Sequence, residues 1–461
     1  MNSTLPTLFQ QSPTGSARLG LAGLAAALAF GAPGTARADA VTDWNAIATT
    51  PMVFTRLGSP PFQVRALAIV HIAVHDALNS IAPRYRTYHP LDPAPGGASP
   101  DAAIAAAAHT ALVRLFDALP PASAAETAQR VAALDYIDAR YAAVLGADLD
   151  PAEEAGIAIG ERAANAAFLQ RHVFNGTRWV ASDGAQAAHE PAYIATGGIG
   201  AYALTGPSAA FTGWEFVTPF ATNSAAQFAT APGRVLDVRS RFYADQYNEV
   251  KHQGDARVRG AHPDSQQTRT ARFWPAGGWD WNGNLRLIVD GRGLDRWQHA
   301  RLFALANMAM SDALVSLFRS KYQYRFWRPI TAIRTLDDGN PRTTADPGWV
   351  PFSANPPYPD YPCGSPGLTG AATQTLRNVL GTNALGFTRS VRVPAVVLPV
   401  PMATLPETTI TRTYNSLSIA ENEQARGRMY EGIHFSEGCH ASIKTANRVA
   451  DWVYQHALRP Y

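Results

Sequence analysis

Three fixed cations and one histidine lie in two segments of the chain that are about a hundred residues apart. Lys321 and Arg328 belong to the first segment, and Arg428 and His434 belong to the second. This set suits a tetrahedral oxyanion, because a guanidinium group binds two oxygens at once and an ammonium group adds a point charge. An imidazole in line with the central atom completes it. The four residues therefore predict a pocket that binds phosphate or vanadate.

The spacing within each segment predicts how these side chains are positioned. Seven residues make about two turns of helix, so Lys321 and Arg328 are expected on one helix face, roughly 10 Å apart. Arg428 and His434 are six residues apart, which is an off-face step, so their helix must end between them. Gly432 is a natural terminator that would direct His434 into the space beyond the helix.

A glycine-bearing turn at residues 358–367 lies between the two cationic segments and precedes an expected helix. Such a turn offers unpaired backbone amides to an anion, helped by the helix dipole. Gly364 permits a close approach and Ser365 can cap the helix, whereas Pro366 removes one amide donor. Taken alone, the segment also fits an ordinary loop before a capped helix.

The two cysteines, Cys363 and Cys439, each lie within a few residues of an expected anion ligand. The fold that assembles the pocket would also bring the two sulfurs together, and an oxidising compartment would permit a disulfide. The alternative is two separate thiols, with Cys363 serving as a small residue of the pocket wall.

The amino terminus indicates export. Arg18 is the only charged residue before the apolar stretch 19–30, and small residues follow it. This pattern predicts a signal peptide over residues 1–38, cleaved near Ala38 or Ala40, and a periplasmic or secreted protein. An uncleaved anchor or a misassigned start is the alternative.

Residues 39–461 contain no evident linker and are predicted to form one domain. The chain is 46% hydrophobic and 16% charged, which provides ample core. A net charge of +3 is too small to favour nucleic acid or an anionic membrane as a partner. No further run of about 20 apolar residues indicates an integral membrane protein.

Helical signals dominate the chain, and strand signals are weak. Apolar residues recur at a three-to-four spacing over residues 64–81. The other expected helices cover residues 101–119, 151–171, 239–251, 294–318, 366–380, 416–431 and 440–458. Loop-rich stretches cover residues 181–232, 254–283 and 337–362. We therefore predict an all-α helical bundle with long loops over the mouth of the pocket.

His71, His75 and Asp76 raise the possibility of a metal site, because two histidines four apart share a helix face. Nothing in the sequence completes the ligand set, so structural roles are favoured. The segment 43–45 is likewise expected to hold the new amino terminus in place rather than to catalyse.

In this order, the three segments resemble the superfamily of vanadium-dependent haloperoxidases and type 2 phosphatidic acid phosphatases, which includes bacterial acid phosphatases. The family pattern of Lys, six residues and Arg-Pro is matched at Lys321, Arg328 and Pro329. Outside the motifs, residues 43–45, 71–79 and 248–251 look like those of secreted bacterial haloperoxidase-type members. The resemblance covers most of the mature chain and implies an all-helical fold.

The second family pattern, Pro-Ser-Gly-His, is only half retained. Pro362 and Gly364 match, Cys363 stands for the serine, and Ser365 stands where histidine is expected. Serine cannot replace a histidine that acts as a general acid, and loss of such an acid typically costs about 10²- to 10⁴-fold in rate. His440 is a possible substitute.

The third family pattern is Ser-Arg, five residues, His, three residues, Asp. The chain keeps Arg428 and His434, with Gly427 for the serine and Gly438 at the aspartate position. Because that aspartate would orient the imidazole, Glu437, one residue earlier, is a possible replacement.

The resemblance implies the chemistry. In phosphatases of this type the matching histidine attacks phosphorus, and in haloperoxidases it is the metal ligand that holds vanadate while hydrogen peroxide oxidises a halide. The implied catalytic residues are His434 and Ser365. The implied cofactor-binding residues are Lys321, Arg328, Cys363, Gly364, Arg428 and His434. We predict a haloperoxidase-like enzyme; an acid phosphomonoesterase acting on phosphate esters and a phosphate- or vanadate-binding homologue without turnover are the alternatives.

Overall fold

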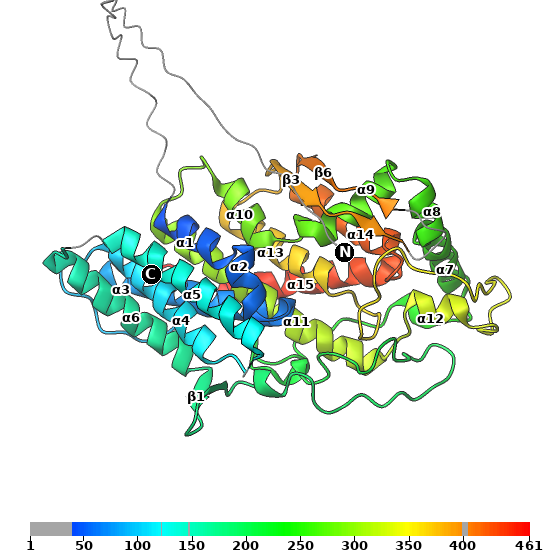
Figure 1. Cartoon of the computed structure of the whole chain (residues 1–461), viewed down its shortest axis with the longest axis horizontal. Helices are drawn as coiled ribbons and strands as arrows, with labels where there is room; N and C mark the ends of the chain where they lie inside the picture. The colour runs from blue at the N-terminus through cyan, green and yellow to red at the C-terminus, as the bar shows by residue number, and fades with distance from the viewer. Residues whose placement is uncertain (1–38, 121, 146–147, 399–403) are drawn as a thin grey trace, which may run out of the picture. The chain divides into compact units, whose positions relative to one another are not determined.

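The computed structural model describes residues 39–120, 122–145, 148–398 and 404–461. Helices dominate these residues (Figure 1), so the predicted all-α class is confirmed. Residues 39–461 form one unit, and the predicted signal peptide lies outside the described residues.

The helices occur in three groups along the chain. The first group is α1 (Ala40–Ala48), α2 (Pro51–Phe54), α3 (Pro60–Ile81), α4 (Pro100–Asp117), α5 (Ala124–Leu145) and α6 (Pro151–Leu169). The second is α7 (Arg241–Gln253), α8 (Ala256–Ala261), α9 (Gln266–Phe273), α10 (Trp281–Val289), α11 (Arg296–Tyr324) and α12 (Pro329–Arg334). The third is α13 (Ser365–Leu380), α14 (Leu417–Tyr430) and α15 (Ser436–His456).

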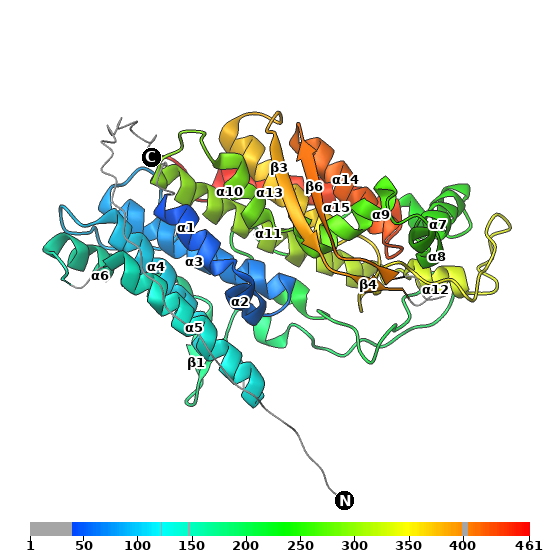
Figure 2. The ribbon, with the colours of Figure 1, turned by 45° about the horizontal axis from the view of Figure 1, so that its top comes forward.

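The strands form three small antiparallel pairs. They are β1 (His172–Phe174) with β2 (Trp179–Ala181), β3 (Phe387–Val393) with β6 (Thr408–Tyr414), and β4 (Val396–Val397) with β5 (Thr404–Leu405). In the longest hairpin Phe387 pairs with Tyr414 and Val393 with Thr408. Figure 2 shows this hairpin on the side of the bundle that carries α9, α10 and α14.

Helix α11 forms the centre of the bundle and packs against α3, α13 and α15. It begins behind Asp295, whose side chain accepts hydrogen bonds from two backbone amides of the first turn in a capping box. Helices α3 and α11 are the two described helices that are long and apolar enough to cross a membrane. In this fold they are core elements, because 94% and 100% of their most apolar windows are buried.

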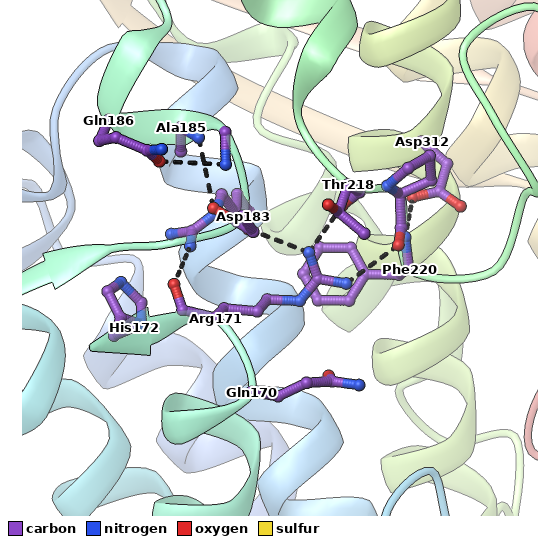
Figure 3. Close-up of polar contacts among 12 residues, drawn as sticks. Gln170, Arg171, His172, Asp183, Ala185, Gln186, Thr218, Phe220 and Asp312 are labelled. Carbon is purple, nitrogen blue, oxygen red and sulfur yellow. Dashed lines mark hydrogen bonds and ion pairs between the residues drawn. The ribbon is translucent and has the colours of Figure 1, made fainter.

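The long loop before α7 is fastened to the bundle by buried charges (Figure 3). Asp312 of α11 accepts hydrogen bonds from the backbone amides of residues 220–222 at 2.6–2.9 Å. Arg171 contacts Asp183 at 3.0 Å and donates to the carbonyl of Thr218 at 2.7 Å. The loop is therefore held in a fixed position although it has little regular structure.

The histidines of α3 have structural roles, as predicted. Nε2 of His71 lies 2.7 Å from the amide of Asn45, and its ring stacks on Phe303. His75 contacts Asp76, whose carboxylate also accepts backbone amides from the chain after α3. Asn45 bonds Asn282 as well, so segment 43–45 does hold the start of the domain against α10.

Two expectations about secondary structure were wrong. The stretch 254–283 contains α8, α9 and a π-turn over Trp274–Gly278 instead of a loop, and the β3–β6 hairpin was not anticipated. The apolar face of α9 is short and contains Thr and Arg, which makes its helical periodicity hard to detect.

Candidate functional site

Lys321 lies in the last turn of α11 and is fully buried. Its ammonium group donates to the carbonyls of Pro359 and Asp360 at 3.0 Å each, and to that of Pro362. Burial, together with neighbouring Arg328, lowers its pKa well below the usual value. The lysine therefore fixes the turn at residues 359–362 around a buried positive centre.

The expectation that Lys321 and Arg328 share one helix face was wrong. The helix ends at Tyr324, and Arg325 adopts a left-handed conformation with φ of 49°. Arg328 is extended and caps α12, because the ring of Pro329 disfavours helical geometry in the preceding residue. The extended segment leads Arg328 back toward Lys321, so the two cations still meet.

The guanidinium of Arg328 is fully buried and only partly hydrogen-bonded. Its Nε donates to the carbonyl of Tyr358, and one Nη donates to that of Ile433, both at 2.7 Å. The same Nη lies 3.2 Å from Nε2 of His434. The other Nη has no partner among the described residues, which leaves a buried donor for an anion.

His434 is held between an arginine and an aspartate. Because Arg328 can only donate, Nε2 of His434 accepts, and its Nδ1 donates to Asp360 at 2.7 Å. Burial and the cations Arg328, Lys321 and Arg428 lower the pKa of His434 well below its usual value. Its imidazole is therefore neutral, with a lone pair on Nε2 beside the cations.

Asp360 is the residue that orients His434, and burial raises its pKa to about 7. Its second carboxylate oxygen is buried and has no partner in the described part of the chain. The expected replacement, Glu437, is not involved. Its carboxylate instead accepts from the backbone amide of Val235 at 2.7 Å and contacts Arg234.

Arg428 comes from the end of α14, and the predicted helix end is confirmed. The helix stops at Tyr430, and Gly432 has φ of +76°. One Nη of Arg428 contacts both oxygens of buried Glu431 at 2.8 Å, while its Nε is buried with no partner among described atoms. Its charge lowers the pKa of Lys321, Arg328 and His434, so all four predicted residues act on one another.

The glycine-bearing turn contributes differently from what was predicted. Cys363 forms a disulfide with Cys439, and its amide donates to the carbonyl of Gly438 at 3.1 Å. Neither group is free to bind an anion, so the assignment of Cys363 as a cofactor ligand is not supported. Gly364 faces open space, since an added Cβ would meet nothing within 4 Å. Ser365 opens α13, and its hydroxyl is buried without a partner in the described structure.

A cleft of about 390 Å³ leads to this cluster. Tyr358, Gly364, Ser365 and Arg428 line it, together with aromatic and proline residues. The Tyr358 ring centroid lies 5.0 Å from Nζ of Lys321 and 4.8 Å from Cζ of Arg328. This ring therefore covers the two buried cations on the side of the cleft.

His440 does not line the cleft, although it was a possible substitute for the missing acid. Its Nδ1 lies 3.0 Å from the carbonyl of Ser436, one turn earlier on α15. The cleft is therefore lined by Ser365, which occupies the position of histidine in the family pattern, and not by His440.

The arrangement fits an oxyanion. One Nη of Arg328, Nε of Arg428 and the hydroxyl of Ser365 are buried groups without partners in the described chain, and Gly364 leaves space beside them. Lys321 adds charge, although its protons are already bound to carbonyls. Nε2 of His434 has a single lone pair, which accepts from Arg328 at 3.2 Å, so ligation of a metal-centred oxyanion would replace this hydrogen bond.

The sequence did not predict roles for Asp360 and Tyr358, although both lie in the segment 358–367 that was expected to bind an anion. The signal that was present is a carboxylate between two prolines, three residues before Cys363, in a segment already singled out for anion binding. A buried carboxylate beside a histidine is a common orienting partner.

Known proteins are similar to this chain in sequence and in fold. Residues 301–461 match a family model described as the VCPO second helical-bundle domain. The chain is 26% identical to the vanadium chloroperoxidase of Curvularia inaequalis over an alignment of 385 residues. The alignment covers 70% of this chain and 61% of that protein. It therefore spans about three fifths of the length of this relative.

Solved structures share the fold. A bacterial vanadium-dependent iodoperoxidase superposes with a TM-score of 0.67 at 20% identity, covering 91% of this chain and 95% of the other. The holo form of a bacterial vanadium-dependent chloroperoxidase gives 0.65 at 15% identity, with 89% and 94% covered. An apo form of a bacterial chloroperoxidase of this kind gives 0.61 at 16% identity, with 88% and 93% covered.

Proposed function

We infer, from the place of this chain in the superfamily of vanadium-dependent haloperoxidases and type 2 phosphatidic acid phosphatases, that it is a haloperoxidase-like enzyme. We propose that it binds vanadate and uses hydrogen peroxide to oxidise a halide to hypohalous acid. In the overall reaction hydrogen peroxide, halide and one proton give hypohalous acid and water. The predicted signal peptide supports an exported protein.

One observation carries this proposal: Nδ1 of His434 donates to Asp360, so Nε2 is the atom that faces the cations. Burial and these cations lower the pKa of His434 well below its usual value, which favours the neutral form. A neutral Nε2 is the form that ligates a metal. Vanadate, when bound, supplies the activation of hydrogen peroxide toward halide. The residues Arg328, Lys321 and Arg428 would neutralise the charge of its oxygens at the inner end of the cleft, where Arg328 and Lys321 are buried.

The proton balance differs from that expected in the family. A serine hydroxyl can donate a hydrogen bond but has no pKa near neutrality, so Ser365 would orient an oxygen of the bound anion without acting as an acid. The proton consumed in the reaction must therefore come from solvent through the cleft. We accordingly expect turnover that is slow at neutral pH and rises in acid.

The test is reconstitution of the purified mature chain with vanadate, followed by assays of bromide and iodide oxidation. Activity that needs both vanadate and hydrogen peroxide, and that is lost in His434→Ala, supports the proposal. Absence of oxidation by the vanadate-loaded protein overturns it. Hydrolysis of p-nitrophenyl phosphate, lost in the same variant, would instead identify a phosphomonoesterase.

A further inference from the structure

The cleft in front of the oxyanion site is lined by a polar side chain whose amide has no hydrogen-bond partner among the described residues. We propose that this cleft binds a phenol, a flat aromatic compound whose hydroxyl group pairs with the side-chain amide of Gln424. Binding of the phenol in this cleft does not depend on the function proposed above. The role of the phenol as the acceptor of halogen rests on the function proposed above.

Gln424 lies on α14, one turn before Arg428, and lines the cleft. It is 0% exposed, yet neither its amide nitrogen nor its amide oxygen has a hydrogen-bond partner among the described residues. Burying an amide without partners is unfavourable, because its hydrogen bonds to water are lost on folding and are not replaced. The cost is removed if a ligand bonds to both atoms.

Another buried glutamine shows the contrast. Gln63 of α3 donates its amide nitrogen to the carbonyls of Phe54 and Gly58 at 3.2 and 2.7 Å, and only its oxygen lacks a partner. That side chain has a structural role at the start of α3. Gln424 has no such bond to the described protein, and it belongs to the lining of the cleft.

The walls of the cleft suit a flat ring. Aromatic side chains line it from four parts of the chain: Phe211, Trp274, Trp279, Phe318 and Tyr358. Proline residues supply further rigid apolar surface. A volume of about 390 Å³ lies within the range of roughly 300–1,000 Å³ that is usual for small-molecule sites.

Gly427 brings one of these rings next to α14. A Cβ at this position would lie 3.2 Å from Cδ1 of Trp274, so a larger residue would push the indole away. The family pattern has serine here, and its absence permits the close packing. The indole nitrogen of Trp274 is also buried without a partner in the described chain.

Phe211, another aromatic residue of the lining, has a strained backbone. Phe211 has φ of 61°, a left-handed conformation that bulky residues rarely adopt. The loop that carries it is fastened to Asp312 and Arg171 (Figure 3), which holds the ring against Phe318 and Trp214. Such strain is often retained where a binding surface requires it.

A phenol offers both a donor and an acceptor to the Gln424 amide, whose Oε1 and Nε2 each lack a partner among the described residues. Its hydroxyl donates to the Oε1 of Gln424 and accepts from the Nε2, and its ring packs on the aromatic walls. The electron-rich ring then lies beside Arg428 and Ser365. Transfer of halogen from hypohalous acid to a ring carbon replaces a C–H bond by a carbon–halogen bond, and the ring proton and the hydroxide leave as water.

The experiment uses p-cresol and p-xylene, which differ by exchange of a hydroxyl for a methyl group of similar size. Calorimetric titration of the mature chain without vanadate or peroxide gives the dissociation constant of each. Gln424→Leu is compared with the wild type, and Arg426→Gln, an exposed position on the same helix, is the control. We expect the ratio of the two dissociation constants to change by about threefold to tenfold in Gln424→Leu alone.

An unchanged ratio in Gln424→Leu overturns the proposal, and so does a wild-type protein that binds neither compound at millimolar concentration. If Gln424→Leu does not fold, Gln424→Met, which keeps the length of the side chain, is measured in the same way. Because the titrations contain no vanadate, failure of the proposed haloperoxidase activity leaves their result unaffected. Phenol binding with no halogenated product would contradict the proposed activity only.

Discussion

His434 and Asp360, which are 74 residues apart in the chain, are joined by a hydrogen bond of 2.7 Å between Nδ1 and Oδ1, and both side chains are buried. The loop after α14 brings the histidine, and the turn fixed by Lys321 brings the aspartate. The pKa of Asp360 rises from 3.8 to about 7, and that of His434 falls well below 6.5. The two shifts have opposite effects on stability.

For Asp360, the folded protein holds a proton between about pH 4 and 7 that the unfolded chain releases. Its contribution to the free energy of unfolding is present below pH 3.8 and is lost as pH rises through about 7. For His434, the unfolded chain binds a proton below pH 6.5, whereas the folded protein does not bind it until the pH is much lower. Its contribution is therefore lost as pH falls below 6.5.

We predict that the two slopes offset each other in the wild type and appear separately in single variants. In Asp360→Asn the free energy of unfolding should fall as pH drops below 6.5, and in His434→Gln it should fall as pH rises from about 4 to 7. Each slope is up to about 1.4 kcal/mol per pH unit. Urea unfolding at several pH values measures both, and equal pH dependence in the two variants would contradict the assignment.

Anion binding should depend on Arg428 and not on Arg426, which lies two residues away and is exposed. Arg428→Gln removes a charge that lines the cleft and the buried, unpartnered Nε, so vanadate or phosphate affinity should fall by about tenfold or more. Arg426→Gln should leave the affinity unchanged. Calorimetry with each anion gives the answer, and equal losses in both variants would indicate a general surface effect.

Gly432→Ala should destabilise the fold and disturb His434. The residue has φ of +76°, and an added Cβ would overlap the backbone oxygen of Gly254. Gly381 has a similar φ of +71° but open space around it, so Gly381→Ala should cost only about 1–2 kcal/mol of backbone strain. Chemical denaturation should show a larger loss for Gly432→Ala; equal losses would mean that the neighbouring backbone yields.

The disulfide should contribute strongly to stability, because Cys363 and Cys439 close a loop with a sequence separation of 76. A loop of that length corresponds to about 4 kcal/mol by chain entropy. Replacing both cysteines by serine, or reducing the wild type, should lower the free energy of unfolding by a similar amount. A reduced wild type that is as stable as the oxidised protein would show that the bond is not formed in solution.

Ser365→His should raise haloperoxidase turnover, since it restores a group that can protonate at neutral pH in the cleft. The expected gain is about 10²-fold at pH 7 and smaller in acid, where solvent already supplies protons. Ser365→Gln matches the added bulk without a titratable proton and should show no gain. Steady-state rates of bromide oxidation across pH decide between the two, and similar rates in both variants would exclude an acid role.

The sequence predicted which charged residues come together more accurately than the path of the chain that brings them there. Gly432 was correctly predicted to follow a helix end, because glycine adopts the left-handed conformation that commonly terminates a helix. The shared helix face of Lys321 and Arg328 was wrong, although Pro329 already argued against a helical Arg328. Two different backbone paths bring the same cations together, and residue spacing alone does not distinguish them.

Asp360 and Gln424 show what residue spacing does not reveal. Asp360 is brought to His434 by the three carbonyl bonds of Lys321, which are tertiary contacts with no local signature. Gln424 occupies an ordinary helical position, and its importance depends on the absence of partners around it among the described residues of the fold. Both require knowledge of how distant segments pack.

The ring of Tyr358 over Lys321 and Arg328 has a kinetic consequence. We expect an oxyanion that enters through the cleft to displace this aromatic cover before it reaches the guanidinium. Loading of the protein would then approach a ceiling rate as the anion concentration increases, because the rotation of one side chain limits entry.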